Sequence, residues 1–178
     1  MTAAAPDLTT NDRSVRDEVV HEAATMVLYV SIVEIAELAA IPESHFATGS
    51  VTGPVGAELI ALLWGTAMGL ALAHWFAFGF AARGFRGERH TRLDTYVGLA
   101  QVGAAAFVAA ISSLPALFLS DENAQVLTGY IPAVLVGVVS YLIARSGGRS
   151  RTASVVYGIT ALVLGFVVAF AKSRLAAH

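Results

Sequence analysis

The feature that most constrains this sequence is its series of five long apolar stretches, separated by short polar segments. A helix that crosses the hydrocarbon core of a bilayer needs about 20 mostly apolar residues, and five stretches approach or exceed that length. They cover residues 20–41, 57–80, 93–119, 126–144 and 153–171. Because lipid offers the backbone no hydrogen-bond partners, each stretch is predicted to form an α-helix.

The composition argues against a water-soluble protein. Of the 178 residues, 56% are hydrophobic and 13% are charged, whereas a soluble domain carries roughly 25% charged residues. A chain of this length is able to bury a soluble core, so its size does not account for the missing charge. The sequence predicts an all-α, polytopic transmembrane bundle of five spanning helices over residues 20–173, with the lipid bilayer as its partner.

The arginines predict the orientation of the bundle. Nine of them lie before the first predicted helix, between the second and third, or between the fourth and fifth: Arg13, Arg16, Arg83, Arg86, Arg89, Arg92, Arg145, Arg149 and Arg151. The segments 42–56 and 120–125 contain no Lys or Arg. Cytoplasmic loops carry an excess of positive charge, so a cytoplasmic N-terminus is expected. Lys172 and Arg174 are the exception, which a re-entrant or interfacial fifth helix would remove.

Other features narrow the class of protein. Residues 1–19 are predicted to be a flexible cytoplasmic tail, and residues 174–178 a short C-terminal tail. The absence of cysteine excludes disulfides and thiolate sites, and a net charge of −2 gives no reason to expect a nucleic-acid partner. No nucleophile–base set, phosphate-binding loop or pair of haem-ligating histidines is visible. Neither an enzyme nor a cofactor is therefore expected, and metal binding stays open.

Two acids inside the first predicted helix, Glu34 and Glu37, carry the main functional signal. An ionisable side chain within a spanning helix costs about 2.5–3.5 kcal/mol on insertion scales and usually faces the protein interior or a water path. A spacing of three residues places both acids on one face, where they cannot both ionise freely in a low dielectric. The pair suits proton or cation handling. In the alternative, Glu37 lies near the outer interface and Glu34 is a neutral acid bonded across helices.

His74, in the second predicted helix, is the next candidate. Its depth, counted from the charged residues at the cytoplasmic side, matches that of Glu34 within about one helical turn, and sequential helices are usually neighbours. A Glu34–His74 pair is thus a candidate proton relay or cation site, with a structural hydrogen bond as the alternative. Glu58 at the start of this helix is a candidate for an acidic outer entrance, or else a solvated carboxylate at a helix start.

Further polar residues fall in the cytoplasmic halves of the later helices. They are Gln101, Ser140, Tyr141, Tyr157 and Thr160. These side chains are candidates to line the cytoplasmic part of a polar path, and interhelical hydrogen bonding is the more ordinary use.

Small residues predict close helix contacts. Gly65 and Gly69 form a GxxxG pair, and Gly158 and Gly165 form a second small-residue stripe. Such stripes hold helices together in lipid, either within one chain or between copies. Ala67 and Ala71 share a face with His74, which permits close approach there.

Two prolines fall within predicted helices. Pro115 and Pro132 are expected to kink the third and fourth helices. Ser112 and Ser113 precede the first of these prolines and are placed to bond a carbonyl that it frees.

The stretch WGTAMGLALAHWFAF (64–78), in its Ala- and Arg-rich surroundings, resembles small uncharacterised integral membrane proteins of actinobacteria. The resemblance covers mainly the first two predicted helices. It implies a multi-pass protein of a bacterial plasma membrane and carries no functional residues with it.

The leading hypothesis is a small, homo-oligomeric membrane channel or transporter for a cation or proton. Its polar path would use Glu34, Glu37, His74, Glu58 and Gln101. The alternative is a non-catalytic membrane subunit or scaffold of a larger complex, with the small-residue stripes as its interface.

Overall fold

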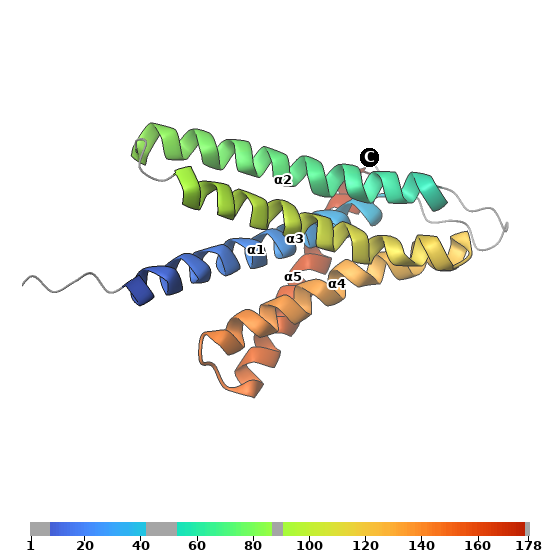
Figure 1. The fold of residues 1–178 in the computed structure, drawn as a ribbon. Coiled ribbons are helices and arrows are strands. Elements are labelled where there is room, and N and C mark those ends of the chain that lie inside the picture. The colour runs from blue at the N-terminus through green and yellow to red at the C-terminus, as the bar shows by residue number, and fades with distance from the viewer. Residues whose placement is uncertain (1–7, 42–52, 87–90, 177–178) are drawn as a thin grey trace, which may run out of the picture.

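The computed structural model describes residues 8–41, 53–86 and 91–176, and the elements within them are all α-helices (Figure 1). Five helices follow one another: α1 (Leu8–Leu38), α2 (Gly56–Arg86), α3 (Thr91–Phe118), α4 (Asp121–Ser146) and α5 (Arg151–Ala176). Each of the five predicted apolar stretches corresponds to one helix. The all-α prediction is therefore confirmed.

Four helices in the described part of the chain are long and apolar enough to cross a membrane. The candidate spans are Val15–Leu38, Gly56–Phe80, Asp94–Phe118 and Asn123–Ser146. Spans of 24 or 25 residues reach about 36 Å, which exceeds the ~30 Å of a hydrocarbon core. In α5 the part whose side chains are described, Arg151–Val167, is too short to count as a candidate span. The fifth span and the cytoplasmic N-terminus stay predictions.

Helix α1 begins well before the apolar stretch that predicts it. Residues 8–19, expected to belong to a flexible tail, are helical from Leu8 onward, and residues 1–7 lie outside the described ranges. Neither Gly nor Pro occurs between Leu8 and Leu38. A helix that has formed in the apolar part therefore continues into the polar part at little cost, because propagation is far easier than nucleation. The predicted C-terminal tail likewise begins within α5, which ends at Ala176.

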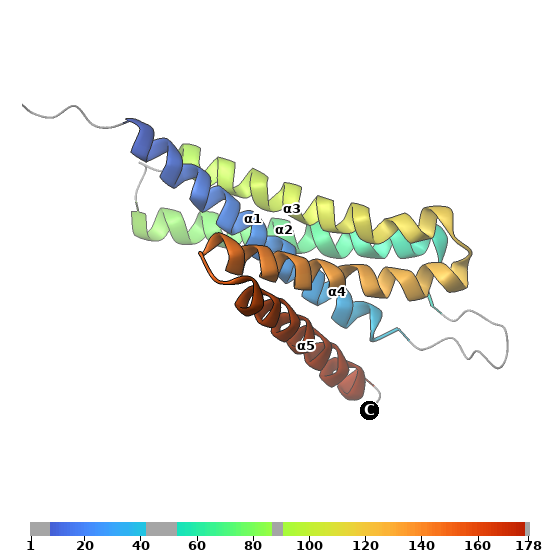
Figure 2. The ribbon, with the colours of Figure 1, turned by 90° about the horizontal axis from the view of Figure 1, so that it is seen from below.

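The helices do not pack in simple sequential order. Helix α1 packs mainly against α3 and α4, α2 packs against α3 and touches α1 only slightly, and α5 lies at the outer edge against α4 and α1 (Figures 1 and 2). The expectation that α1 and α2 are neighbours holds only for a small contact, because α1 packs more extensively on α3 and α4. Only residues 87–90 separate α2 from α3, whereas residues 39–55 separate α1 from α2. The short connection holds α2 on α3, and the long one leaves α1 free to pack elsewhere.

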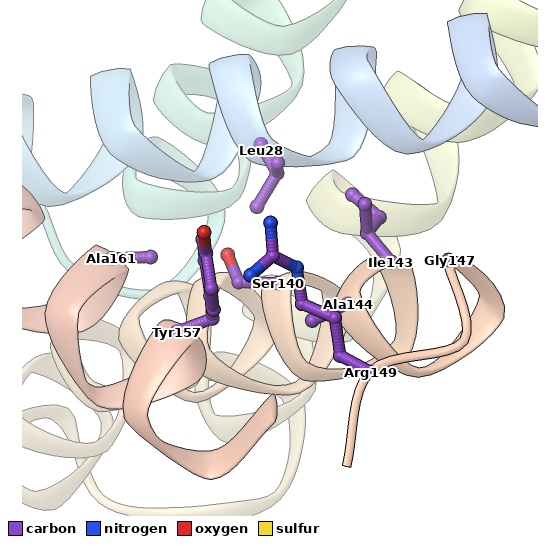
Figure 3. Close-up of a pocket in the computed structure, with 8 residues that line it drawn as sticks. All are labelled: Leu28, Ser140, Ile143, Ala144, Gly147, Arg149, Tyr157 and Ala161. Carbon is purple, nitrogen blue, oxygen red and sulfur yellow. The ribbon is translucent and has the colours of Figure 1, made fainter. Parts of the chain in front are cut away.

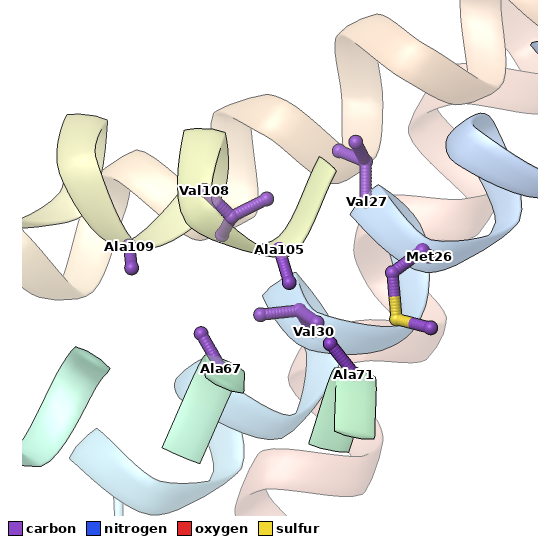
Figure 4. Packing of buried hydrophobic residues seen from close by; sticks show 8 residues of the cluster. All are labelled: Met26, Val27, Val30, Ala67, Ala71, Ala105, Val108 and Ala109. Atoms are coloured by element: carbon purple, nitrogen blue, oxygen red, sulfur yellow. The ribbon is translucent and has the colours of Figure 1, made fainter. Parts of the chain in front are cut away.

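A cluster of small and branched apolar residues fills the space between α1, α2 and α3 (Figure 4). Its buried members are Met26, Val27, Val30, Ala67, Ala71, Ala105, Val108 and Ala109. Alanines on α2 and α3 let the bulkier side chains of α1 enter between them, which is the kind of packing that holds helices together in lipid. The predicted close-approach face of Ala67 and Ala71 is thus used within the chain.

The two glycine stripes differ in whether they pack against another helix of the chain. A Cβ atom on Gly158 would lie 2.8 Å from the Gly137 carbonyl oxygen, so the backbones of α5 and α4 nearly touch there. Gly65 and Gly69 have open space where a Cβ would be, and both lie exposed on α2. The α5 glycine therefore serves packing within the chain, and the α2 pair does not.

Candidate functional site

Glu34 is buried completely, at 0% exposure, at the interface of α1 with α3. The Ser112 hydroxyl of α3, also at 0% exposure, donates a 2.7 Å hydrogen bond to the Glu34 Oε2 atom. The second carboxyl oxygen, Oε1, is buried and has no hydrogen-bond partner among the described residues. One half of this carboxyl group is held in place, and the other half is open to a proton or ligand.

A second polar contact joins the same two helices. The Gln101 Nε2 atom donates a 3.0 Å hydrogen bond to Glu22 Oε2, and Gln101 is completely buried. The two bonded pairs are 79 and 78 residues apart in sequence, so α1 and α3 run parallel in a constant register. Twelve residues separate the two acids of α1, which places the two contacts about 18 Å apart along the helix.

An apolar plug, defined here as Met26, Val27 and Val30, separates the two polar contacts. These residues are 2%, 8% and 0% exposed and pack against alanines of α2 and α3. Water has no polar partners there, and empty apolar spaces in proteins stay dry. The plug therefore interrupts the polar surface between Glu22 and Glu34.

Several more buried polar atoms lack partners in the described part of the chain. They are Ser31 Oγ, Glu37 Oε2, Gln101 Oε1 and Thr128 Oγ1. Ser31, Glu34 and Glu37 follow one another at three-residue intervals along one side of α1. Most buried polar atoms in proteins have a hydrogen-bond partner, so this run of unpaired oxygens marks a place able to bind a proton, water or a small cation.

Thr128 extends this observation to α4. Its hydroxyl is completely buried, and it lies one helical turn before Pro132. Proline has no N–H group, so the Thr128 carbonyl lacks its usual helical donor. Helix α4 therefore presents polar backbone as well as a buried hydroxyl.

Glu37 differs from Glu34 in exposure. It is half-buried, with one carboxyl oxygen fully enclosed, and it lies almost one turn nearer the end of α1. The two acids thus differ in exposure: the Glu34 carboxyl is completely enclosed, and Glu37 is partly exposed at the edge of the bundle.

The predicted Glu34–His74 pair is not formed. No hydrogen bond or ion pair joins these two residues in the described ranges, and Glu34 bonds Ser112 instead. His74 is half-buried on α2, and α2 packs on α3 with little contact to α1. Helices α1 and α2 do meet at Ala67 and Ala71, but the partner of Glu34 comes from α3 and not from α2.

Glu58 is exposed in the first turn of α2, where the helix dipole favours a carboxylate. No hydrogen bond in the described ranges joins it to Glu37. Ser113 was predicted to bond the carbonyl that Pro115 frees, which is that of Ile111. It donates instead, at 2.6 Å, to the Ala109 carbonyl. Ser112 was assigned the same role, and its bond to Glu34 was missed. The position of Ser112, three residues after Ala109 on the small-residue face of α3, could have indicated that its side chain faces another helix.

No group of three or more His, Asp or Glu side chains suited to a metal ion occurs within the described ranges. No protein-family model matches the chain, and neither a curated protein nor a solved structure matches it.

Proposed function

We propose that this protein is a small proton transporter of the membrane in which Glu34 takes up and releases the proton. The observation that carries the proposal is the completely buried Glu34 carboxyl, with one oxygen bonded to Ser112 and the other without a partner among the described residues. A buried charge is expensive, so the site favours a bound proton. Ser112 keeps one oxygen occupied as a hydrogen-bond acceptor and leaves the other as the protonation site.

A proton fits this geometry better than a larger cation. Metal cations in proteins are held by several oxygen ligands at once, and no cluster of acids of that kind lies in the described ranges. A proton needs one acceptor oxygen and almost no space. The neighbouring hydroxyl of Ser31 and the carboxyl of Glu37 supply the next acceptors along α1.

Glu34 is completely enclosed, and its surroundings differ in the two directions along α1. Glu37 leads from Glu34 toward the edge of the bundle, whereas the apolar plug separates Glu34 from Glu22 in the other direction. An open channel needs a continuous polar path, and this arrangement favours a carrier in which the plug has to separate before the proton continues. With five spans and a cytoplasmic N-terminus in a bacterial plasma membrane, the Glu37 side faces outward.

The test is proton flux into liposomes that contain the purified protein. We expect flux in the wild type and at least a tenfold loss in Glu34→Gln, which keeps the size of the side chain but removes the titratable group. Glu58→Gln is the matched control, because it removes an exposed acid and should leave flux unchanged. Equal flux in wild type and Glu34→Gln, or no flux in either, would remove the proposal.

A second candidate function is a non-catalytic subunit of a larger membrane complex. It is favoured by the exposed Gly65 and Gly69 of α2, since these small residues have open space above them and make no packing contact of that kind within the chain. A partner that co-purifies in fixed stoichiometry, and is lost in Gly65→Leu, would support it. A homo-oligomer that is stable without any other protein would count against it.

A further inference from the structure

A cleft of about 350 Å³ lies between α1, α4 and α5, close to the α4–α5 turn, and Glu34 is not among the residues that line it. Residues from three helices and the turn line it (Figure 3): Leu28, Ser140, Ile143, Arg149, Tyr157 and Ala161. Two of the polar residues that the sequence assigned to a proton path, Ser140 and Tyr157, therefore lie here and not beside Glu34. Their neighbour in the cleft is Arg149, which the sequence analysis used only as a loop charge that predicts orientation.

Backbone hydrogen bonds fix the turn that carries Arg149. Gly148 has φ +77°, and its N–H donates to the Arg145 carbonyl, while the Arg149 N–H donates to the Ala144 carbonyl. This pair of bonds is the Schellman motif that ends many helices, with glycine in the left-handed position. Ser150 then caps α5 by accepting a bond from the Ala153 N–H. Both helix ends fix the backbone of the turn, so the direction in which Arg149 leaves it is set.

The side chain of Arg149 is held over an aromatic ring. Its guanidinium carbon lies 4.4 Å from the centroid of the Tyr157 ring, within the range of a cation–π contact. No ion pair joins Arg149 to a carboxylate in the part of the chain that the structure describes. Figure 3 shows the guanidinium pointing into the cleft, alongside the hydroxyls of Ser140 and Tyr157. A fixed cation and two hydroxyls facing one space form a donor set suited to a phosphate group.

The rest of the cleft is apolar and open at its rim. Leu28 and Ala161 form its walls, and Ile143 and Tyr157 are 43% and 47% exposed. The candidate span of α4 ends at Ser146, three residues before Arg149. The cation therefore lies at the level where a spanning helix meets the lipid headgroups, with hydrocarbon-like surface directly below it.

We propose that this cleft binds one anionic phospholipid, with its phosphate on Arg149 and the Ser140 and Tyr157 hydroxyls and an acyl chain along Leu28 and Ile143. Basic pockets between spanning helices bind acidic headgroups in this way. Arg145, in the last turn of α4, donates a hydrogen bond to the Arg149 carbonyl, and its positive charge beside the site favours a headgroup with net negative charge over a zwitterionic one. Bound lipid would tie α5 to α1 and α4 at this end of the bundle.

Native mass spectrometry of the full-length protein in detergent tests the site. Phosphatidylglycerol and phosphatidylcholine are titrated in parallel, and inorganic phosphate is added as a competitor. Arg149→Ala removes the cation, and Arg149→Lys keeps the charge but loses the planar stack on Tyr157. Arg151→Ala is the matched control, because it removes the same charge only two residues further along the chain, from a residue that does not line the cleft. Circular dichroism checks that each variant is folded.

We expect phosphatidylglycerol to bind the wild type on the order of tenfold more tightly than phosphatidylcholine. Arg149→Ala should abolish this preference, Arg149→Lys should reduce it, and Arg151→Ala should keep it. Equal binding of the two lipids to the wild type, or equal losses in Arg149→Ala and Arg151→Ala, would overturn the proposal. Displacement of the lipid by millimolar phosphate would show a site for soluble anions and would overturn it too. If Arg149→Ala does not fold, Arg149→Lys against Arg151→Ala decides the question.

Discussion

The Ser112 hydroxyl of α3 donates a 2.7 Å hydrogen bond to the Glu34 carboxyl of α1, and both side chains are completely buried. The acid that makes α1 expensive to insert into lipid is therefore also the residue that joins α1 to α3. One oxygen of this carboxyl is held in place by the hydrogen bond, and the other is still able to accept a proton. The two helices share a second bond of this type, between Gln101 and Glu22, so that the α1–α3 interface is polar at both ends and apolar between them.

Loss of the Ser112 hydroxyl should destabilise the bundle. Ser112→Ala leaves the Glu34 carboxyl without its donor, and we expect a loss of about 1–2 kcal/mol in the free energy of unfolding. Ser113→Ala is the matched control. Its hydroxyl only bonds a carbonyl of its own helix, so we expect a loss below about 0.5 kcal/mol. Unfolding in mixed micelles of mild detergent and dodecyl sulfate, followed by circular dichroism, measures both. Equal losses would show that the bond to Glu34 contributes nothing specific.

A charge at position 101 should be tolerated less than an apolar side chain. Gln101→Glu places two carboxyls at the 3.0 Å contact with Glu22, whereas Gln101→Leu only removes the hydrogen bond. Burying an unpaired charge costs more than replacing a polar pair with apolar atoms, so the glutamate variant should be the less stable by about 1–3 kcal/mol. Thermal unfolding in detergent compares the two variants. A glutamate variant as stable as the leucine variant would mean that the added charge is neutralised at this contact, by water or by a proton shared with Glu22.

The glycine of the α4–α5 contact should be far more sensitive than those on the outer face of α2. In Gly158→Ala the new Cβ would lie 2.8 Å from the Gly137 carbonyl oxygen, so the two backbones have to separate. We expect a loss of about 1–3 kcal/mol in stability, typical of overpacking. Gly65→Ala meets open space and should gain up to about 1 kcal/mol from helix propensity. The same unfolding assay decides, and a Gly65→Ala variant that loses stability would indicate a contact with a second chain.

Gly98 and Trp75 offer a spectroscopic test of the α2–α3 interface. A Cβ on Gly98 would lie 2.5 Å from the Trp75 Nε1 atom. The indole ring has to move in Gly98→Ala, and its fluorescence emission should shift. The chain contains two tryptophans, so the measurement is made in a Trp64→Phe background. Gly103→Ala, which meets open space on the same helix, should leave the spectrum unchanged, and an unchanged spectrum in Gly98→Ala would contradict the packing of α2 on α3.

The positions of the helices could be predicted from the sequence, and their pairing could not. Lipid offers the backbone no hydrogen-bond partners, so long apolar stretches form helices, and each of the five stretches corresponds to one helix, four of which are long and apolar enough to cross a membrane. Pairing depends on side-chain fit, and the alanine faces of α2 (Ala67, Ala71) and α3 (Ala105, Ala109) are equally able to receive α1. The sequence order predicts the smaller contact of α1 with α2, and the lengths of the two connections, which the rule of sequential neighbours ignores, favour its larger contact with α3.

The same limit applies to the candidate site. Glu34 stands out in any spanning helix because its burial is costly, so its importance could be inferred from sequence. Its partner could not, since serine is common in such helices and Ser112 and Ser113 are adjacent but bond differently. The role of Arg149 could not be predicted from the sequence for another reason. Its role depends on the left-handed Gly148 and on the Tyr157 ring, which only the folded turn brings together.

The apolar plug gives the sharpest test of how protons reach Glu34 in the proposed transporter. Val30 is completely buried and lies one helical turn before Glu34. Val30→Ser places a hydroxyl in the dry stretch and should admit water between Glu22 and Glu34, so that proton flux into liposomes rises at least severalfold. The rise should vanish in the double variant Val30→Ser/Glu34→Gln, because the proton still has to pass through the carboxyl. Val138→Ser, on an exposed face of α4, controls for a general loosening of the bundle. A flux that rises equally in Val138→Ser, or that persists without Glu34, would mean that protons cross along another route and that the plug does not control them.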